Sequence, residues 1–285
     1  MSPNSLDNPF HHTETNKGTS SELTRRLLSS ADAQALTEAL GEENQSPKIE
    51  PQQDLPPTSD ISMSGEEKKE VEKESYWTRE QYIEWAQEFG KNEQWMNETF
   101  EFQKDGTTVV WGSLNLRNTE IKQLPIGLME VKGSLNISRN PSINLNGYPK
   151  KVGGSFLCRS NNIFSPQGMP KEVGGGIYLE SNKISSLYGL PDKVTGKLIL
   201  YTNELKNLDG ISKEISGNLN LGGNNQLTSL EALKGVKIGG DLWLRDIPAT
   251  TIPVGIQIGG NIFIKSSQTD LIADAKRKGY RLRLK

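Results

Sequence analysis

The stretch Val152-Gly153-Gly154-Ser155-Phe156-Leu157-Cys158 decides the fold, because close copies of it recur along the chain. The glycine that follows the valine by two residues recurs at positions 112, 133, 154, 175, 196, 217, 240 and 260. Successive glycines are therefore 21, 21, 21, 21, 21, 23 and 20 residues apart. A repeat of this length and regularity predicts a solenoid, in which each repeat forms one coil of a stack.

Each repeat carries apolar residues at fixed places. If the recurring glycine is position one, large apolar residues occupy positions three and five, and Val or Ile stands two residues before the glycine. Strand side chains alternate between two faces, so these residues and the glycine share one face. We predict one short strand per repeat, parallel to its neighbours, with an inward glycine where the coil leaves no room for a side chain.

Position eight is an asparagine in five successive repeats. These residues are Asn140, Asn161, Asn182, Asn203 and Asn224. An asparagine amide can bond the backbone of its own and the next coil, which predicts a structural ladder. The alternative is a ligand site built from this row. Glycine and proline recur farther along each repeat and disfavour a regular outer helix, so we expect extended or 3₁₀ backbone there.

The segment Leu198-Ile199-Leu200-Tyr201-Thr202-Asn203-Glu204-Leu205 matches the pattern Leu-x-Leu-x-x-Asn-x-Leu. Residues 110–265 thus resemble the leucine-rich-repeat family, and more narrowly the short repeats of uncharacterised bacterial and phage proteins. The resemblance implies an α/β, β-rich solenoid over 112–265 that serves as an interaction module. The leucine usually found three residues before the first strand leucine is absent, so we expect a longer strand and a different curvature.

The ends of the chain differ from the repeats. Residues 1–75 are predicted to be a disordered acidic tail, because they are poor in aromatic residues. Met1–Trp77 contains 15 acidic and 7 basic residues, a net charge of −8. The remainder contains 20 acidic and 26 basic residues, a net charge of +6. Apolar spacing within the tail favours a helix over 22–40, either transient or able to dock into a partner's groove.

Two segments are predicted to cover the ends of the solenoid. Residues 76–111 combine a helix that begins at Thr78 with a hairpin around Asp105-Gly106. Their tryptophans favour an N-terminal cap, and the alternative is a small aromatic recognition module. Residues 266–285 predict a C-terminal cap made of a short helix and an edge strand.

No catalytic constellation is evident in the sequence. Cys158 occupies an inward position and is expected to be a buried apolar residue, while His11 and His12 have no partners for a metal site. We therefore expect no enzyme activity and no cofactor. The chain has no membrane-length apolar stretch and no Sec-type signal, so we expect a cytoplasmic monomer.

The outward strand positions carry the candidate binding residues. Position four offers Leu157, Tyr178, Ile199, Trp243 and Phe263, and position six offers Arg159, Tyr201 and Arg245. Exposed aromatic residues beside arginine are typical of interaction hot spots, so we predict that an unknown protein partner binds here. The alternatives are that the cap or the tail covers this face, or that β-propensity alone selected these residues.

Two other functions remain as alternatives. The Ser- and Asn-rich start is compatible with a non-Sec export signal of a translocated bacterial effector or host-contact protein. The basic C-terminus, with Lys276, Arg277, Arg281 and Arg283, is compatible with weak nucleic-acid binding. That second alternative is disfavoured, because the basic run lacks an aromatic platform.

Overall fold

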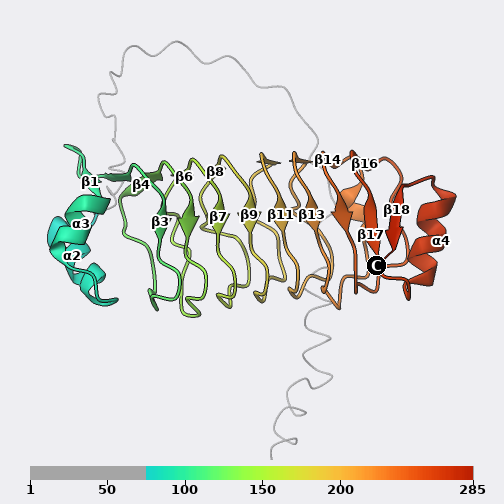
Figure 1. The fold of residues 1–285 in the computed structure, drawn as a ribbon, viewed down its shortest axis with the longest axis horizontal. Helices are drawn as coiled ribbons and strands as arrows, with labels where there is room; N and C mark the ends of the chain where they lie inside the picture. The colour runs from blue at the N-terminus through green and yellow to red at the C-terminus, as the bar shows by residue number, and fades with distance from the viewer. Residues whose placement is uncertain (1–74, 285) are drawn as a thin grey trace, which may run out of the picture. The chain divides into compact units, whose positions relative to one another are not determined.

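The computed structural model describes residues 75–284. The predicted helix over 22–40 and, apart from Ser75, the predicted tail over 1–75 lie outside the described residues. Residues 75–284 form a parallel β-solenoid of about 8 coils with few helices (Figure 1).

A nine-stranded parallel sheet runs the length of the repeats, with one short strand from almost every coil. Equivalent positions of successive repeats pair in register, as Leu198 does with Ile177 on one side and Leu219 on the other. In spatial order its strands are β3 (Leu114–Asn115), β5 (Leu135–Asn136), β7 (Phe156–Leu157), β9 (Ile177–Tyr178), β11 (Leu198–Ile199), β13 (Leu219–Asn220), β15 (Leu242–Trp243), β17 (Ile262–Ile264) and β18 (Leu282–Leu284).

A second row of strands contains the recurring Val or Ile. It divides into two sheets, and at one edge β1 (Glu101–Phe102) runs antiparallel to β2 (Thr108–Val110). The first sheet continues through β2, β4 (Leu128–Val131), β6 (Lys151–Val152) and β8 (Glu172–Val173). The second contains β10 (Lys193–Val194), β12 (Glu214–Ile215), β14 (Lys237–Ile238) and β16 (Gln257–Ile258).

The prediction of one strand per repeat was wrong, because the chain bends between two short strands. In the repeat quoted first, β6 ends at Val152 and β7 begins at Phe156. The glycine between them does not point into the core. A Cβ on Gly154 would lie 2.5 Å from Ser134 Oγ and 2.8 Å from Ser134 N, both in the preceding coil. Glycine is therefore required by close contact between successive coils.

The core lies between the two rows of strands. Positions three and five are buried in every repeat, and the Val or Ile before the glycine is buried in all but the last, where Ile258 is half-buried. Cys158 is fully buried at position five, and its burial raises the pKa of the thiol to about 12. The outer segments are mostly turns and irregular backbone, and η1 (Glu231–Leu233) is the only 3₁₀ helix within residues 75–284.

At the N-terminal end, α2 (Arg79–Gln87) and α3 (Glu93–Thr99) pack on the first coil. Thr78 and Gln81 form a capping box at the start of α2. Tyr82 is fully buried, and its hydroxyl lies 2.5 Å from Thr108 Oγ1 in β2. The Trp85 indole donates to the Gln123 carbonyl at 3.2 Å. These contacts join the helices to the solenoid.

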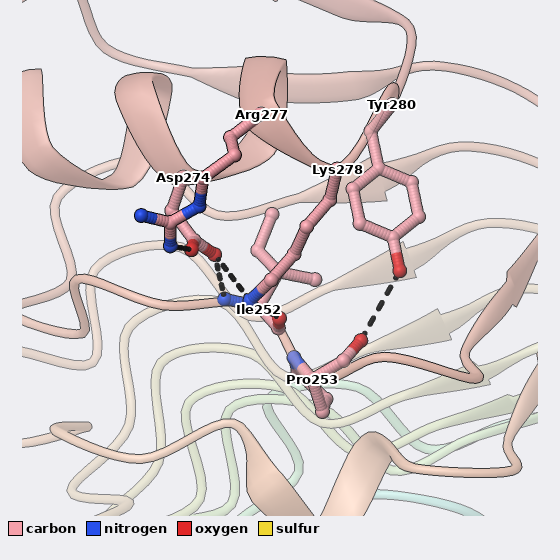
Figure 2. A network of polar contacts seen from close by, with 6 residues as sticks. All are labelled: Ile252, Pro253, Asp274, Arg277, Lys278 and Tyr280. Carbon is pink, nitrogen blue, oxygen red and sulfur yellow. Dashed lines mark hydrogen bonds and ion pairs between the residues drawn. The ribbon is translucent and has the colours of Figure 1, made fainter.

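At the other end, α4 (Thr269–Arg277) packs beside β18. Figure 2 shows the polar contacts that join it to the preceding coil. The buried carboxylate of Asp274 accepts from the Ile252 backbone N–H and from Lys278 Nζ, each at 2.8 Å, and also pairs with Arg277. Tyr280 donates to the Pro253 carbonyl at 3.1 Å.

Candidate binding face

The outward face of the nine-stranded sheet carries all eight predicted partner-binding residues. Position-four residues form one row across the coils, in which Leu157, Tyr178 and Ile199 are successive in-register neighbours. Trp243 and Phe263 are neighbours farther along the same row. Arg159, Tyr201 and Arg245 belong to a second row at position six. The face therefore consists of two parallel rows of side chains.

The position-four residues are less exposed than the sequence suggested. Leu157, Tyr178, Ile199, Trp243 and Phe263 are all half-buried, whereas Tyr201 at position six is 46% exposed. Parallel strands are only about 4.8 Å apart, so each side chain covers the flank of the next. Trp243 and Phe263 show this directly, because their rings stack with centroids 3.9 Å apart and planes 6° from parallel.

A polar cluster lies at the centre of the face. The Arg159 guanidinium lies over the Tyr178 ring, with Cζ 4.6 Å from the ring centroid. Arg159 Nε also lies 2.7 Å from Glu180 Oε1 in an ion pair. Burial raises the pKa of Glu180, and a backbone hydrogen bond and the Arg159 charge oppose this only in part. The sequence did not single out Glu180, which follows Tyr178 by two residues and lies beside Arg159 in the position-six row.

The face is hollowed at two places. The N-terminal hollow has a volume of about 250 Å³. Its lining includes Asn136, Ser138, Arg117, Arg139, Leu157, Arg159 and Glu180. Three arginines face one glutamate there, so the lining carries a net positive charge.

The C-terminal hollow has a volume of about 240 Å³ and is lined by Tyr201, Asn220, Gly222, Trp243, Arg245 and Asp246. Gly222 opens the space between Tyr201 and Arg245. A Cβ at position 222 would lie 3.2 Å from Tyr201 Cδ2 and 3.0 Å from the Arg245 carbonyl oxygen. Asp246 is paired with Lys265 at 2.6 Å, which leaves the Arg245 charge without an acidic counterpart in the lining.

The two hollows share one local design. In each, the position-four residue is an asparagine whose Oδ1 accepts a hydrogen bond from the backbone N–H two residues later. The bond joins Asn136 to Ser138 at 3.1 Å and Asn220 to Gly222 at 3.0 Å. The asparagine is thereby held against its own strand, and the small residue at position six leaves the space above it empty. A short polar residue followed by Ser or Gly two positions later was the sequence signal for these hollows.

Two arginine nitrogens in these linings lack hydrogen bonds. Nε of Arg159 and Nε of Arg245 are buried and have no hydrogen-bond partner among the described residues. Arg159 Nε is close to Glu180, but the contact does not have hydrogen-bond geometry. Buried donors of this kind are costly unless a partner satisfies them, and a bound acceptor is one way to do so.

The asparagines at position eight contact the backbone between coils. Nδ2 of Asn203 donates to the Leu200 carbonyl at 3.1 Å and to the Leu179 carbonyl of the preceding coil at 3.0 Å. Its Oδ1 accepts from Ile184 N, also in the preceding coil, at 3.0 Å. The ladder therefore connects each coil to the one before it. The expectation that each asparagine would bond the next coil was wrong. With both amide protons and the oxygen of Asn203 engaged, this side chain is not available to a ligand.

Among the other predicted sites, Arg283 continues the position-four row, because it pairs in register with Phe263. Arg277 and Lys278 pair with Asp274, whereas Lys276, Arg281 and Arg283 are exposed. In the part of the chain that the structure describes, no cluster of His, Cys, Asp or Glu is placed to hold a metal ion. None of the helices between residues 75 and 284 has the length and apolar character needed to cross a bilayer. His11 and His12 lie outside the described residues.

The chain matches no family model, no curated protein and no solved structure.

Proposed function

We propose that this chain is a non-enzymatic, leucine-rich-repeat-like scaffold that binds a protein partner through the outward face of its nine-stranded sheet. The observation that carries the proposal is the continuity of that face. An apolar row formed by Leu157, Tyr178 and Ile199 runs between two arginine-lined hollows. Half-buried aromatic and aliphatic residues next to arginine resemble the anchors and pockets of protein interfaces.

The second row of strands is a poorer candidate. Its outward residues alternate in charge along the stack and pair with one another. Lys151 Nζ lies 3.8 Å from Glu130 and 3.5 Å from Glu172, and Lys193 lies 3.0 Å from Glu214. The row is also interrupted between β8 and β10. Alternating charges along a parallel row already satisfy one another, so this face offers a partner fewer unpaired groups.

In the same proposal, the terminal helices protect the ends of the solenoid. Tyr82 and Phe100 at one end, and Leu271 at the other, are buried against the repeats. Without such cover an apolar end of the stack would meet water. The helices thus favour a scaffold whose binding surface is the side of the stack rather than its ends.

The test is capture of a partner from native lysate by the full chain and by two variants. Tyr178→Asp and Trp243→Asp each place a charge on the face. Tyr188→Asp is the matched control, because Tyr188 is 67% exposed and lies in an outer segment. Circular dichroism first establishes that all variants keep the native fold. Loss of a specific protein by both face variants but not by Tyr188→Asp supports the proposal. Equal capture by all four proteins, or none by any, rules out this face.

A further inference from the structure

We infer that the open edge of β3 binds an extended segment of a separate protein, which adds a strand to the nine-stranded sheet. The segment runs parallel to β3, has short side chains, begins with a basic residue and ends with an acidic one. This site lies at the edge of the sheet and does not depend on the proposed function of its outward face. Unpaired backbone groups, an adjacent hollow and the charges beside it carry the inference.

The N-terminal cap supplies a strand to only one of the two rows of strands. β1 pairs with β2 and closes the edge of that sheet. β3 is the last strand of the nine-stranded sheet and pairs with β5 alone. Leu114 and Leu116 are nevertheless buried, because their side chains belong to the core that the cap helices cover. The first coil is therefore closed toward the core and open along its edge, where unpaired strands can accept another chain.

Two backbone N–H groups of the first coil lack partners that later coils have. Gly133 N donates to the Gly112 carbonyl at 2.9 Å, and Ser134 N donates to Ser113 Oγ at 3.0 Å. Equivalent bonds recur in the third coil. Within residues 75–284 no coil precedes the first, and the N–H groups of Gly112 and Ser113 have no hydrogen-bond partner there.

The strand itself presents further open groups. Leu114 N and Leu116 N donate to the second coil at 2.9 and 2.8 Å. Successive residues of a strand direct their backbone groups to opposite sides, so Asn115 N and the carbonyls of Ser113 and Asn115 point to the open side. Gly112, Ser113 and Asn115 are exposed, whereas their counterparts in the second coil are half-buried. The edge thus offers three donors and two acceptors to an added parallel strand.

Gly112 leaves room for the backbone of such a strand. A Cβ on Gly133 would lie 2.5 Å from Ser113 Oγ and 2.6 Å from Ser113 N, because the first coil lies against it. A Cβ on Gly112 would have no atom within 4 Å. The added strand can therefore approach Gly112 as closely as the first coil approaches Gly133.

A hollow lies where this edge begins. It has a volume of about 560 Å³ and is lined by residues 97–102 and 110–113. The Trp111 ring, which is 66% exposed, forms part of its wall, and the indole donates to Glu101. Lys132 lies over the same ring but is paired with Glu130. The hollow can hold the first side chain of the added strand.

The charges at the two ends of the edge differ in sign. The lining of this hollow contains Glu98 and Glu101 and no basic residue, so it favours a basic side chain. At the other end, Arg117 belongs to the positively charged N-terminal hollow of the outward face. Trp111 and Arg117 are six residues apart. A parallel strand with a basic residue first and an acidic residue six positions later matches both ends.

The contacts between coils also indicate the residues between these two. Ser134 Oγ accepts from Ser155 N at 3.0 Å, so a serine in the added strand can satisfy Ser113 N in the same way. Leu114 and Leu116 are only 2% and 0% exposed, so the inward positions of the added strand meet a core that is already covered and must be small. The partner is therefore a hydrophilic extended segment rather than an apolar one.

The probe is the acetylated and amidated peptide Lys-Gly-Ser-Ala-Thr-Ala-Glu, added at millimolar concentration to the isotope-labelled full chain. Binding should shift the NMR amide signals of Gly112, Ser113 and Asn115, whose N–H groups gain acceptors. The signal of Gly217, which already donates to the Gly196 carbonyl at 2.9 Å, should stay in place. A peptide with N-methyl groups on both alanines lacks the donors for the two open carbonyls and should not bind. Exchange of its first and last residues should weaken binding by about tenfold or more.

Gly112→Ala is the decisive variant. Its Cβ has no neighbour in the described chain but would meet the added strand. The variant should keep the unfolding curve of the wild type and lose the peptide-induced shifts. Asn207→Ala, an exposed position in an outer segment, is the matched control and should keep them.

Three results overturn the inference. They are the absence of shifts at the three amides, binding of the N-methylated peptide, and unchanged binding by Gly112→Ala. Sedimentation that shows a dimer for the wild type and a monomer for Gly112→Ala also overturns it, because the edge then binds a second copy of this chain. None of these results decides the capture experiment with Tyr178→Asp and Trp243→Asp, whose residues lie on the outward face.

Discussion

Replacing Asn203 by alanine tests how much the asparagine ladder contributes to stability. The side chain is 7% exposed and makes three hydrogen bonds, two donated and one accepted. The three backbone groups are affected differently. Leu179 O and Leu200 O each keep a second bond, from the amides of Asn182 and Asn224, whereas no other partner is found for Ile184 N among the described residues.

The expected loss follows from this difference. One orphaned buried N–H costs about 2 kcal/mol, and each of the two lost bonds to a still-paired carbonyl costs about 1 kcal/mol. The free energy of unfolding of Asn203→Ala should therefore fall by about 4 kcal/mol. Asn203→Thr should lose less, about 3 kcal/mol, because a threonine hydroxyl can keep the bond within its own coil. Thr119 makes this bond in the first coil, to the Leu116 carbonyl at 2.8 Å.

The assay is urea unfolding followed by far-ultraviolet circular dichroism. The matched control is Asn207→Ala in the same coil, where an exposed asparagine makes one local bond to Asp209 N at 3.1 Å. That control should change the free energy of unfolding by less than about 1 kcal/mol. If Asn203→Ala is no more destabilising than Asn207→Ala, the ladder does not stabilise the stack. Because repeats couple mainly to their neighbours, a second transition in the Asn203→Ala curve would indicate that the stack unfolds in two parts.

Two further changes test the contacts between coils. Gly154→Ala should lower the free energy of unfolding by at least about 2 kcal/mol, because the added Cβ meets the preceding coil. The matched control is Gly112→Ala at the same position of the first repeat, where a Cβ would have no atom within 4 Å. In urea unfolding this control should be close to neutral. Asp274 is buried, which raises its pKa, but the hydrogen bonds and the Lys278 charge outweigh this and hold the pKa below its ordinary value. A carboxyl group with a lowered pKa stabilises the folded protein fully above its ordinary pKa, and this stabilisation is lost as the pH falls below that value. Asp274→Asn should therefore have a lower free energy of unfolding than wild type at pH 7, and the difference between the two proteins should shrink at strongly acid pH. A difference that stays constant with pH would contradict this origin of the stability.

The regular part of the fold followed directly from the sequence. In-register stacking puts the same repeat position in the same environment in every coil, so the apolar character of positions three and five predicted the core. Phe156 and Leu198 are both fully buried for this reason. The helix from Arg79 and its capping box were equally readable, because a cap depends on residues only three positions apart.

The bend between two strands could not be read in the same way. Val152 and Phe156 are four residues apart, so they share a face in one continuous strand and also face the same core across a bend. The glycine between them fits both readings. Only the spacing to the preceding coil, where a Cβ at 154 would meet Ser134, decides between them. That contact joins residues a full repeat apart and has no local signal.

Of the candidate site, the sequence predicted the apolar row but not the two hollows, because only the row repeats at one position of each coil. The apolar row was visible because it repeats one position, as Leu157, Tyr178 and Ile199 do. A hollow depends on unlike residues in adjacent coils. Gly222 opens a space only because Tyr201 and Arg245 flank it in the coils before and after. Such combinations become visible once the register between coils is known.

In the proposed scaffold, each coil separates the residues that stabilise the stack from those that would contact a partner. Tyr201 at position six stands between Leu200, which is fully buried in the core, and Asn203, which bonds the preceding coil. Its backbone is therefore held on both sides by residues that do not lie on the outward face. A surface fixed in this way loses little conformational entropy on binding, so a modest contact area can still give useful affinity. If the proposed function holds, changes at positions four and six alter the partner while positions one, three, five and eight preserve the stack.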